Sequence, residues 1–335
     1  MQITVLGCGS WGTALALVLA RNGHDVVLLG RNPDEISGMR SHRENFRYLP
    51  GFILPETVEV GYLTDPPADA DFVVAAMPSR AFREVIGLEG LSELLRRVPL
   101  LIASKGLDVT SSRLLSDVAL ELHPNITAGV ITGPNLAIEM VRGIPTAAVA
   151  AFEDQATTDY VRQAFVSGAF RVYRSDDRCG LQLAGALKNV VAIAAGMSDG
   201  LGFGDNTKGA LLARGWREML SLGLAMGARA ETFMGIAGLG DLFATAASGL
   251  SRNYRLGRAL GEGAKLLAAV DALGQVAEGV PTAEAAVQLA RQFGVSMPIF
   301  EGIEAVLRGR MDPKRGVALL MERETPEERI PGIGL

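Results

Sequence analysis

A glycine-rich turn near the N-terminus constrains the fold of this chain more than any other feature. Gly-Cys-Gly-Ser-Trp-Gly follows a short apolar run, Gln2–Leu6, and opens an apolar helical stretch, Trp11–Arg21. In such a strand–turn–helix unit the first glycine permits the tight turn, the second admits a close ligand, and the third allows close packing. The helix N-terminus adds N–H donors and a partial positive charge. We therefore expect a dinucleotide pyrophosphate to bind here, rather than a purely structural glycine turn. The glycines predicted to bind it are Gly7, Gly9 and Gly12.

Strand-like and helix-like stretches alternate through the first half of the chain. The strand-like runs are rich in Val and Ile without polar alternation, which indicates strands buried on both faces of a mostly parallel sheet flanked by helices. The predicted strands are Gln2–Leu6, Asp25–Leu29, Asp71–Ala76, Leu100–Ser104, Ile126–Ile131, Thr146–Ala151 and Phe170–Tyr173. The predicted helices between them include Trp11–Arg21, Ser111–Leu122 and Gln155–Phe165.

After about Cys179 the strand signal stops and only helical periodicity remains. The predicted helices there are Leu181–Met197, Ala210–Met226, Tyr254–Leu260, Thr282–Phe293 and Ile299–Leu307. A chain of 335 residues is long enough for two domains with separate cores. We therefore expect an α/β Rossmann-type domain over residues 1–178 and an all-α domain, binding substrate, over residues 179–335.

Charge and composition exclude several classes of function. A net charge of −5 argues against a general nucleic-acid or anionic-membrane binder, which needs a basic face. Residues 1–20 carry no charge, but glycines break the stretch and no basic segment precedes it, so a strand, turn and helix explain it better than a signal peptide or membrane span. The two cysteines, Cys8 and Cys179, lie far apart and the three histidines are scattered, so we expect no metal site, no disulfide and a cytoplasmic location.

The residue after the second predicted strand bears on the choice of cofactor. Rossmann units that prefer NAD usually place an acidic residue there to accept hydrogen bonds from the ribose 2′-hydroxyl. This chain has Arg31 instead. Because a guanidinium pairs well with a 2′-phosphate, we expect NADPH to be used at least as well as NADH. The alternative is a solvated surface arginine.

Lys188 is the strongest candidate for catalysis. On a helix it shares its face with apolar residues one and two turns away, namely Leu181, Ala184, Val191, Ala192 and Ala195. A lysine in such a stripe is costly to bury unless it is paired or its pKa is lowered. Its ammonium could protonate a substrate carbonyl oxygen as hydride arrives, and its neutral amine could take the hydroxyl proton in reverse. The alternative is a lysine whose head group reaches solvent.

Three polar, glycine- or cation-bearing stretches complete the candidate site. Ser104-Lys105-Gly106 and Gly133-Pro134-Asn135 each follow a predicted strand, at the sheet edge where ligands bind. Ser251-Arg252-Asn253 precedes a helix, which suits an oxyanion held by a guanidinium and backbone N–H groups. Each stretch alone is a common loop, but together with Lys188 they predict a site for a small phosphorylated substrate.

Assembled, these residues resemble the NAD(P)-dependent glycerol-3-phosphate dehydrogenase family over nearly the whole chain. The matching stretches are GCGSWGTALA from Gly7, ASKGL from Ala103, ITGPNLA from Ile131, GALKNVVAIAAGMSDGLGFGDNTK from Gly185, GLGDL from Gly238, SRN from Ser251 and GQVAEG from Gly274. The resemblance implies interconversion of dihydroxyacetone phosphate and sn-glycerol 3-phosphate with NADPH/NADP or NADH/NAD, no metal, a role in phospholipid synthesis, and a homodimer.

The resemblance also implies residue roles, with Lys188 as proton donor or acceptor. The residues it places around the substrate are Lys105, Gly133, Asn135, Lys188, Asp241, Ser251, Arg252 and Asn253. Beyond the glycine-rich turn, those it places at the cofactor are Ser10, Trp11, Arg31, Tyr48, Lys105, Ala137, Arg252, Val276 and Glu278. Asn135 stands where the family often has Ser or Thr, so that contact differs in detail. Lys208 is a further candidate for balancing the phosphate charge.

Two other functions compete with this one. The first is a related lysine-dependent dehydrogenase acting on a hydroxy acid such as 6-phosphogluconate or 3-hydroxyisobutyrate, and the SRN stretch argues against it. The second is a non-catalytic NADPH-binding sensor. Such a protein would be expected to lose the lysine or the phosphate-binding cations, whereas this chain keeps both.

Overall fold

The computed structural model describes residues 1–316; the end of the predicted second domain, residues 317–335, lies outside the described residues. The chain divides into two compact units. The first comprises Met1–Ser104 and Leu115–Arg178, and the second comprises Lys105–Leu114 and the chain from Cys179 onward. The short excursion Lys105–Leu114 therefore belongs to the second unit, where Leu107 and Leu114 lie in the apolar core.

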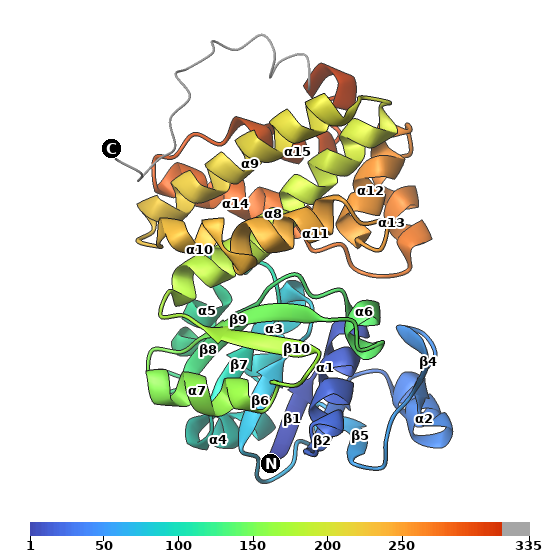
Figure 1. Ribbon diagram of the computed structural model, residues 1–335, viewed down its shortest axis with the longest axis vertical. Coiled ribbons are helices and arrows are strands. Elements are labelled where there is room, and N and C mark those ends of the chain that lie inside the picture. The colour runs from blue at the N-terminus through green and yellow to red at the C-terminus, as the bar shows by residue number, and fades with distance from the viewer. Residues whose placement is uncertain (317–335) are drawn as a thin grey trace. The chain divides into compact units, whose positions relative to one another are not determined.

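A sheet of eight strands forms the centre of the first unit, in the order β10-β9-β8-β7-β6-β1-β2-β5 (Figure 1). Its strands are β1 (Gln2–Leu6), β2 (Asp25–Gly30), β5 (Val58–Tyr62), β6 (Phe72–Ala75), β7 (Leu100–Ile102), β8 (Ala128–Thr132), β9 (Thr146–Ala151) and β10 (Phe170–Arg174). All neighbouring pairs are parallel except β8 and β9, which are antiparallel. The predicted mostly parallel, Rossmann-type sheet is confirmed, with β9 and β10 running against the other strands.

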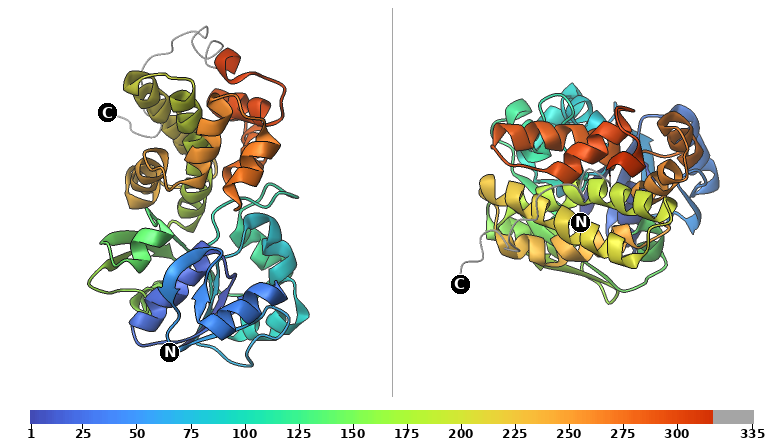
Figure 2. Two further views of the ribbon diagram at one scale, coloured as in Figure 1. Left: turned by 90° about the vertical axis from the view of Figure 1, so that its right-hand side faces the viewer. Right: turned by 90° about the horizontal axis from the view of Figure 1, so that it is seen from above.

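Helices cover both faces of this sheet. They are α1 (Ser10–Arg21), α2 (Pro33–His42), α3 (Ser79–Ile86), α4 (Glu89–Arg97), α5 (Leu115–Leu122), α6 (Ala137–Val141) and α7 (Gln155–Gln163). The chain moves outward from β1 in two opposite directions, to β2 and to β6, so right-handed crossovers place α1 and α3 on opposite faces (Figure 2). One apolar core of this unit includes buried residues of α1 packed with those of β1, β2 and β6.

The sequence patterns missed three strands of the first unit. Strand β5 alternates between exposed Glu59 and buried Val58 and Val60, whereas the strands predicted above are continuous apolar runs. The hairpin of β3 (Glu44–Asn45) and β4 (Leu49–Ile53) is largely polar or exposed and forms a separate two-stranded sheet. Both misses arise because edge and surface strands lack the fully buried pattern of central parallel strands.

The helix predicted over Ser111–Leu122 is wrong at its start. Helix α5 begins only at Leu115, since Ser112 adopts a left-handed conformation with a φ of 57°. Asp108 closes the turn before it, accepting hydrogen bonds from the backbone N–H of Ser111 at 3.1 Å and from its hydroxyl at 2.6 Å. A turn closed by an aspartate side chain outcompetes the helix at this point.

The carboxyl ends of the parallel strands share one edge of the sheet. The glycine-rich turn follows β1, Arg31 follows β2, Ser104 comes shortly after β7, and Gly133 follows β8. The switch point of this sheet lies between β1 and β6, where successive strands begin to be added on the opposite side of β1, and ligands of open α/β sheets bind there. The fold thus places these first-unit residues at one end of the sheet.

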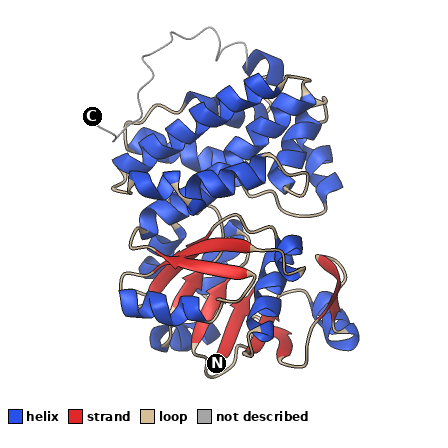
Figure 3. Ribbon diagram, viewed as in Figure 1, coloured by secondary structure: helices blue, strands red, loops and turns tan. Residues whose placement is uncertain are grey.

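From α8 to residue 316, the regular elements of the second unit are all helices (Figure 3). Its elements are α8 (Arg178–Gly200), α9 (Asp205–Ala225), α10 (Ala230–Met234), the π-helical turn η1 (Ile236–Gly240), α11 (Asp241–Ala246), α12 (Arg252–Gly261), α13 (Leu266–Leu273), α14 (Gly279–Gln292) and α15 (Pro298–Leu307). Among residues 1–316, α8 alone is long and apolar enough to cross a membrane, but 94% of its most apolar window is buried within the protein. It is the central core helix of this unit.

Helices α8 and α12 cross at closely spaced glycines. Gly196 and Gly200 of α8 face Gly257 and Gly261 of α12, and a β-carbon on any of the four would press on backbone atoms of the opposite helix. At Gly257 it would overlap the carbonyl oxygen of Ile193. Because backbone cannot yield as a flexible side chain can, this contact fixes the spacing of the two helices.

Gly257→Ala is expected to lower the free energy of unfolding by about 1–3 kcal/mol, the usual cost of overpacking. Chemical denaturation followed by circular dichroism measures it. Gly302→Ala is the matched control, since Gly302 lies within α15 and a β-carbon there meets nothing within 4 Å. That variant should gain about 0.5–1 kcal/mol from helix propensity. Equal stabilities of the two variants would contradict the close crossing.

Candidate active site

The glycine-rich turn of the first unit is shaped to admit a ligand against its backbone. Gly7 has a φ of 114°, and a β-carbon there would lie 2.9 Å from the carbonyl oxygen of Ala76; one on Gly12 would overlap the carbonyl of Gly7. Gly9, by contrast, faces open space and is the N-cap of α1, with no side chain capping the helix. The first N–H groups of a helix lack intrahelical partners and attract anions. The turn therefore fits a dinucleotide pyrophosphate.

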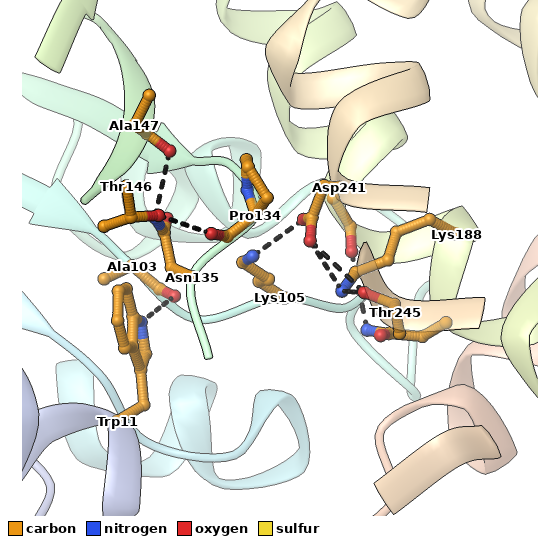
Figure 4. Close-up of polar contacts among 12 residues, drawn as sticks. Trp11, Ala103, Lys105, Pro134, Asn135, Thr146, Ala147, Lys188, Asp241 and Thr245 are labelled. Atoms are coloured by element: carbon orange, nitrogen blue, oxygen red, sulfur yellow. Dashed lines mark hydrogen bonds and ion pairs between the residues drawn. The ribbon is translucent and has the colours of Figure 1, made fainter. Parts of the chain in front are cut away.

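Two side chains of this turn are tied to neighbouring segments. The indole Nε1 of Trp11 donates to the carbonyl of Ala103 at 2.9 Å, just beyond the end of β7 (Figure 4). The hydroxyl of Ser10 donates to the carbonyl of Tyr48 at 2.7 Å, in the β3–β4 hairpin. The predicted cofactor residues Ser10, Trp11 and Tyr48 are thus brought together in one part of the first unit.

Arg31 lies directly after β2 and is exposed. No carboxylate within residues 1–316 forms an ion pair with it. The next residue, Asn32, caps α2 by accepting hydrogen bonds from the backbone N–H groups of Asp34 at 3.0 Å and Glu35 at 3.3 Å. The guanidinium of Arg31 therefore stands at a well-defined strand end and is open to an anionic ligand.

The loop after β8 is held against the start of β9. The amide of Asn135 donates to the carbonyl of Ala147 at 3.0 Å, and the hydroxyl of Thr146 donates to the carbonyl of Pro134 at 2.7 Å (Figure 4). The side-chain oxygen of Asn135 is buried without a hydrogen-bond partner, which leaves an acceptor for a ligand hydroxyl or N–H group. Gly133 is buried, and Ala137 begins α6. The predicted residues Gly133, Asn135 and Ala137 belong to the first unit.

In the second unit a buried carboxylate joins two lysines. The Nζ atom of Lys188 lies 3.0 Å from Oδ1 of Asp241, and the Nζ atom of Lys105 lies 2.8 Å from Oδ2 (Figure 4). Lys188 also donates to the hydroxyl of Thr245 at 2.5 Å. The residue exposures are 5% for Lys188 and 1% for Asp241, so Lys188 does not extend into solvent as the alternative reading required. Lys105, from the excursion, and Lys188, from α8, therefore share one counter-ion.

Burial and the neighbouring charges bring the pKa of the Lys188 amine close to neutral pH. Burial lowers the pKa of Lys188 from 10.5 to about 8; Asp241 opposes this shift, and the nearby charges of Lys105 and Arg252 reinforce it. Burial raises the pKa of Asp241, but the two lysines outweigh it and hold the pKa of this carboxyl below its usual value. A lysine with such a pKa exists in both protonation states in the cell, as an acid–base catalyst requires.

Local backbone geometry presents Asp241 to the lysines. The π-helical turn Ile236–Gly240 immediately precedes α11, and Asp241 is the first residue of that helix. Thr245 follows one turn later on the same face, where its hydroxyl lies 3.3 Å from Oδ1 of Asp241. π-Helical turns often occur at functional sites. The sequence patterns missed Thr245, although its spacing of four residues from Asp241 was the available signal.

Arg252 is the first residue of α12, and Ser251 caps this helix by accepting a hydrogen bond from the N–H of Tyr254 at 3.2 Å. Within residues 1–316 the guanidinium forms no hydrogen bond or ion pair. Burial lowers the pKa of Arg252, and the charge of Glu278 partly offsets this. A largely desolvated guanidinium beside the open N–H groups of a helix N-terminus suits a phosphate. Val276 and Glu278, the latter being the N-cap of α14, are both half-buried.

Asn253, predicted to lie at the substrate, is buried and bonds to two neighbouring helices. Its Nδ2 donates to Oδ1 of Asn189 at 2.9 Å, and its Oδ1 accepts from the N–H of Gly279 at 2.9 Å. These three residues directly follow Lys188, Arg252 and Glu278 in the chain. The side chain of Asn253 thus links α8, α12 and α14 beside the charged groups that those helices carry.

The surroundings of Lys208 and of the Cys8 thiol are also defined. Lys208 pairs with Asp199 at 2.6 Å, which also accepts a hydrogen bond from the hydroxyl of Tyr254 at 2.5 Å. Burial, with a contribution from the charge of Glu35, raises the pKa of the Cys8 thiol to about 12, so this thiol is not a nucleophile at neutral pH. Within residues 1–316 no three or more His, Cys, Asp or Glu side chains gather as metal ligands would.

Comparison with known proteins identifies relatives over the full chain. The family models described as NAD-dependent glycerol-3-phosphate dehydrogenase N-terminus and C-terminus match residues 2–158 and 177–318. Proteins named glycerol-3-phosphate dehydrogenase [NAD(P)+] from Acidovorax sp. (strain JS42) and Variovorax paradoxus (strain S110) are 44% and 45% identical. Each alignment covers 98% of this chain, and 100% and 99% of those proteins, respectively.

A solved structure shows the same architecture. The crystal structure of glycerol-3-phosphate dehydrogenase from Coxiella burnetii matches with a TM-score of 0.90 at 37% sequence identity. The match covers 96% of this chain and 99% of that one. The sequence resemblance described above is therefore confirmed for both halves of the chain.

Proposed function

Since the chain belongs to the NAD-dependent glycerol-3-phosphate dehydrogenase family, we propose that it interconverts dihydroxyacetone phosphate and sn-glycerol 3-phosphate with NAD(P)H. The single observation that carries the chemistry is the buried, carboxylate-paired amine of Lys188. A ketone reduction needs a proton at the developing alkoxide, and an alcohol oxidation needs a base at the hydroxyl. One amine with a pKa of about 8 serves both directions.

In this proposal Lys188 gives its proton to the C2 oxygen of dihydroxyacetone phosphate during reduction, and its neutral amine accepts the C2 hydroxyl proton during oxidation. Asp241 holds the amine in place and stabilises its charged form, and Thr245 accepts another of its hydrogens. Lys105, paired to the other oxygen of Asp241, keeps positive charge close to the anionic substrate.

Arg252 and the N-terminal N–H groups of α12 hold the substrate phosphate, and Asn253 positions them by linking three helices. Binding energy from this remote group orients the carbonyl. Dihydroxyacetone, which lacks the phosphate, should therefore be a poor substrate.

The first unit binds the cofactor, which supplies the hydride when bound. Gly7, Gly9 and Gly12 admit the pyrophosphate to the N-terminus of α1, and Arg31 faces the adenosine ribose. The other proposed cofactor contacts are Ser10, Trp11, Tyr48 and Ala137 from the first unit, with Lys105, Arg252, Val276 and Glu278 from the second. We propose residues 1–178 as the dinucleotide-binding domain and residues 179–335 as the substrate domain, to which the excursion Lys105–Leu114 contributes Lys105.

The pH dependence of the reaction follows from the lowered pKa of Lys188. Reduction needs the ammonium, so kcat/KM for dihydroxyacetone phosphate should fall as pH rises through about 8. Oxidation needs the free amine, so kcat/KM for glycerol 3-phosphate should rise through the same value. On the unfavourable side of the pKa, kcat/KM for each direction should fall by about tenfold per pH unit. Steady-state rates across this range measure both limbs, and a transition near 10.5 would contradict the assignment.

Arg31→Asp is expected to lower the NADPH-to-NADH ratio of kcat/KM by about 10- to 100-fold. A charge-assisted hydrogen bond to the 2′-phosphate is worth about 1.5–3 kcal/mol, and the new carboxylate repels that phosphate. Kinetics with each reduced cofactor at saturating dihydroxyacetone phosphate measure the ratio. An unchanged ratio would show that Arg31 is only a surface residue.

The function itself is tested by following oxidation of NADPH and NADH with dihydroxyacetone phosphate and with dihydroxyacetone, and reduction of NADP⁺ and NAD⁺ with 6-phosphogluconate and with 3-hydroxyisobutyrate. We expect rapid turnover with dihydroxyacetone phosphate alone. Cofactor binding without any turnover would favour the sensor function, and a preference for one of the two hydroxy acids would favour a hydroxy-acid dehydrogenase.

We further propose that the protein acts in the cytoplasm as a homodimer and supplies the glycerol phosphate backbone of phospholipids. Similarity of the chain to named glycerol-3-phosphate dehydrogenases over nearly its full length supports these assignments. Light scattering coupled to size-exclusion chromatography distinguishes a dimer from a monomer.

A further inference from the structure

The β3–β4 hairpin of the first unit is attached directly to the glycine-rich turn. Asn45 is buried, and its Nδ2 donates to the carbonyl of Cys8 and to the hydroxyl of Thr13, both at 2.8 Å. Its Oδ1 accepts from the N–H of Tyr48 at 3.2 Å, and the carbonyl of Tyr48 accepts from the hydroxyl of Ser10 at 2.7 Å. These bonds fix the hairpin relative to the proposed pyrophosphate site.

The hairpin carries a guanidinium that reaches the start of α2. Nη1 of Arg47 lies 2.5 Å from Oε1 of Glu35, and the guanidinium carbon lies 5.1 Å from the centre of the Tyr48 ring. Glu35 is in the first turn of α2, four residues after Arg31. Its charge contributes to the raised pKa of the Cys8 thiol, which places the carboxylate close to the glycine-rich turn. The ion pair thus lies beside the predicted adenosine end of the cofactor.

The two side chains of this pair favour different cofactors, because NAD(H) carries a ribose 2′-hydroxyl where NADP(H) carries a 2′-phosphate. A carboxylate near the end of the second strand accepts hydrogen bonds from the ribose 2′-hydroxyl of NAD(H) and repels a 2′-phosphate. A guanidinium binds the 2′-phosphate of NADP(H). The Arg47 side chain is 58% exposed, so the pair is screened by solvent and is readily exchanged for another partner.

We propose that Glu35 and Arg47 form a cofactor-selecting pair: Glu35 accepts the ribose hydroxyl of NAD(H), whereas Arg47 leaves Glu35 and joins Arg31 on the 2′-phosphate of NADP(H). This inference rests on the proposed function, because it assumes that a dinucleotide occupies the glycine-rich turn. It gives the chain a means of using both cofactors from one site, since each cofactor engages a different member of the pair.

The test measures the dissociation constants of NADP⁺ and NAD⁺ by calorimetry, without substrate, for the wild type, Arg47→Gln and Glu35→Gln. Arg47→Gln should weaken NADP⁺ binding by about tenfold or more, because a charge-assisted bond to the phosphate is lost. The dissociation constant of NAD⁺ should stay within about twofold of the wild-type value. Glu35→Gln should strengthen NADP⁺ binding by up to about fivefold, since Arg47 no longer has a competing partner, and should weaken NAD⁺ binding. The two variants of one ion pair therefore shift the NADP⁺-to-NAD⁺ ratio in opposite directions.

Arg174→Gln and Asp159→Asn are the matched controls. They remove the same charges from an exposed pair at 2.8 Å on β10 and α7, at the opposite edge of the same sheet from β2. Neither should change the ratio of the two dissociation constants. Thermal unfolding of all four variants checks that each is folded.

Each outcome decides the proposal. The proposal is supported if Arg47→Gln and Glu35→Gln change the NADP⁺-to-NAD⁺ ratio of dissociation constants in opposite directions. It is overturned if neither variant changes this ratio, or if both change it in the same direction, because the pair is then only a structural contact. Because binding is measured without substrate, this pattern is independent of which compound is reduced. If the wild type binds neither dinucleotide, the proposed function fails together with the inference.

Discussion

Lys188→Ala is expected to lower kcat for the reduction of dihydroxyacetone phosphate by about 10²–10⁴-fold, the usual effect of losing a positioned acid–base group. The amine of Lys188 is buried, is held by Asp241 and Thr245, and has a pKa of about 8. The other ammonium of the cluster, that of Lys105, lies at the opposite oxygen of the same carboxylate. Steady-state kinetics at saturating substrate and cofactor measure the loss.

Lys265→Ala is the control for removal of one positive charge, because Lys265 is an exposed N-cap of α13. It should keep kcat within about twofold, as surface changes usually do. The dissociation constant of NADP⁺ should be unchanged in both variants. If Lys188→Ala turns over at the wild-type rate, this lysine is not the proton donor.

Asp241→Asn should damage both stability and catalysis. The carboxylate is the counter-ion of the buried Lys188 and the half-buried Lys105, and breaking a buried pair such as Lys188–Asp241 costs about 3–5 kcal/mol. Because Asp241 raises the pKa of Lys188, its loss should lower that pKa further below about 8. The reductive reaction at neutral pH then loses its acid, and the pH–rate profile for reduction moves to lower pH.

The stability of this variant should also recover as pH rises. In the folded state the pKa of the uncompensated Lys188 is lowered, so the unfolded chain binds more protons, and stability increases with pH through the interval between the folded and unfolded pKa values. Asp205→Asn removes an exposed carboxylate from the first turn of α9 and serves as the control. Denaturant titrations at two pH values distinguish the variants. Wild-type stability together with a wild-type pH profile in Asp241→Asn would contradict the role of the shared carboxylate.

The glycine-rich turn and the buried lysine could both be predicted from sequence, because each depends on residues close together in the chain. The strand, glycine turn and helix around Gly7 lie within about one supersecondary unit, and the apolar face around Lys188 is a property of one helix. Each pattern is complete within a short stretch of chain. The Rossmann-type sheet, the start of the helical unit and the burial of Lys188 all followed from such patterns.

Contacts between residues far apart in the chain could not be predicted from these short sequence patterns. Asp241 lies 53 residues from Lys188, and only the family resemblance indicated it. Thr245 was missed because glycines at 235, 238 and 240 obscured the short helix that carries it. The bridging role of Asn253 and the pairing of Arg47 with Glu35 depend on how helices and a hairpin meet, which no single pattern encodes. The antiparallel β9 likewise depends on topology rather than on composition.

Direct titration of the Lys188 amine by nuclear magnetic resonance tests the central claim of this account, that a buried lysine paired with Asp241 serves as the acid–base group. Lysine labelled at its side-chain nitrogen and terminal carbon gives one signal for each residue, and Lys188→Ala identifies the signal of interest. We predict a transition near pH 8 in the folded protein, matching the pH dependence of the reaction. A signal that stays protonated until about 10.5, the ordinary value for lysine, would contradict it.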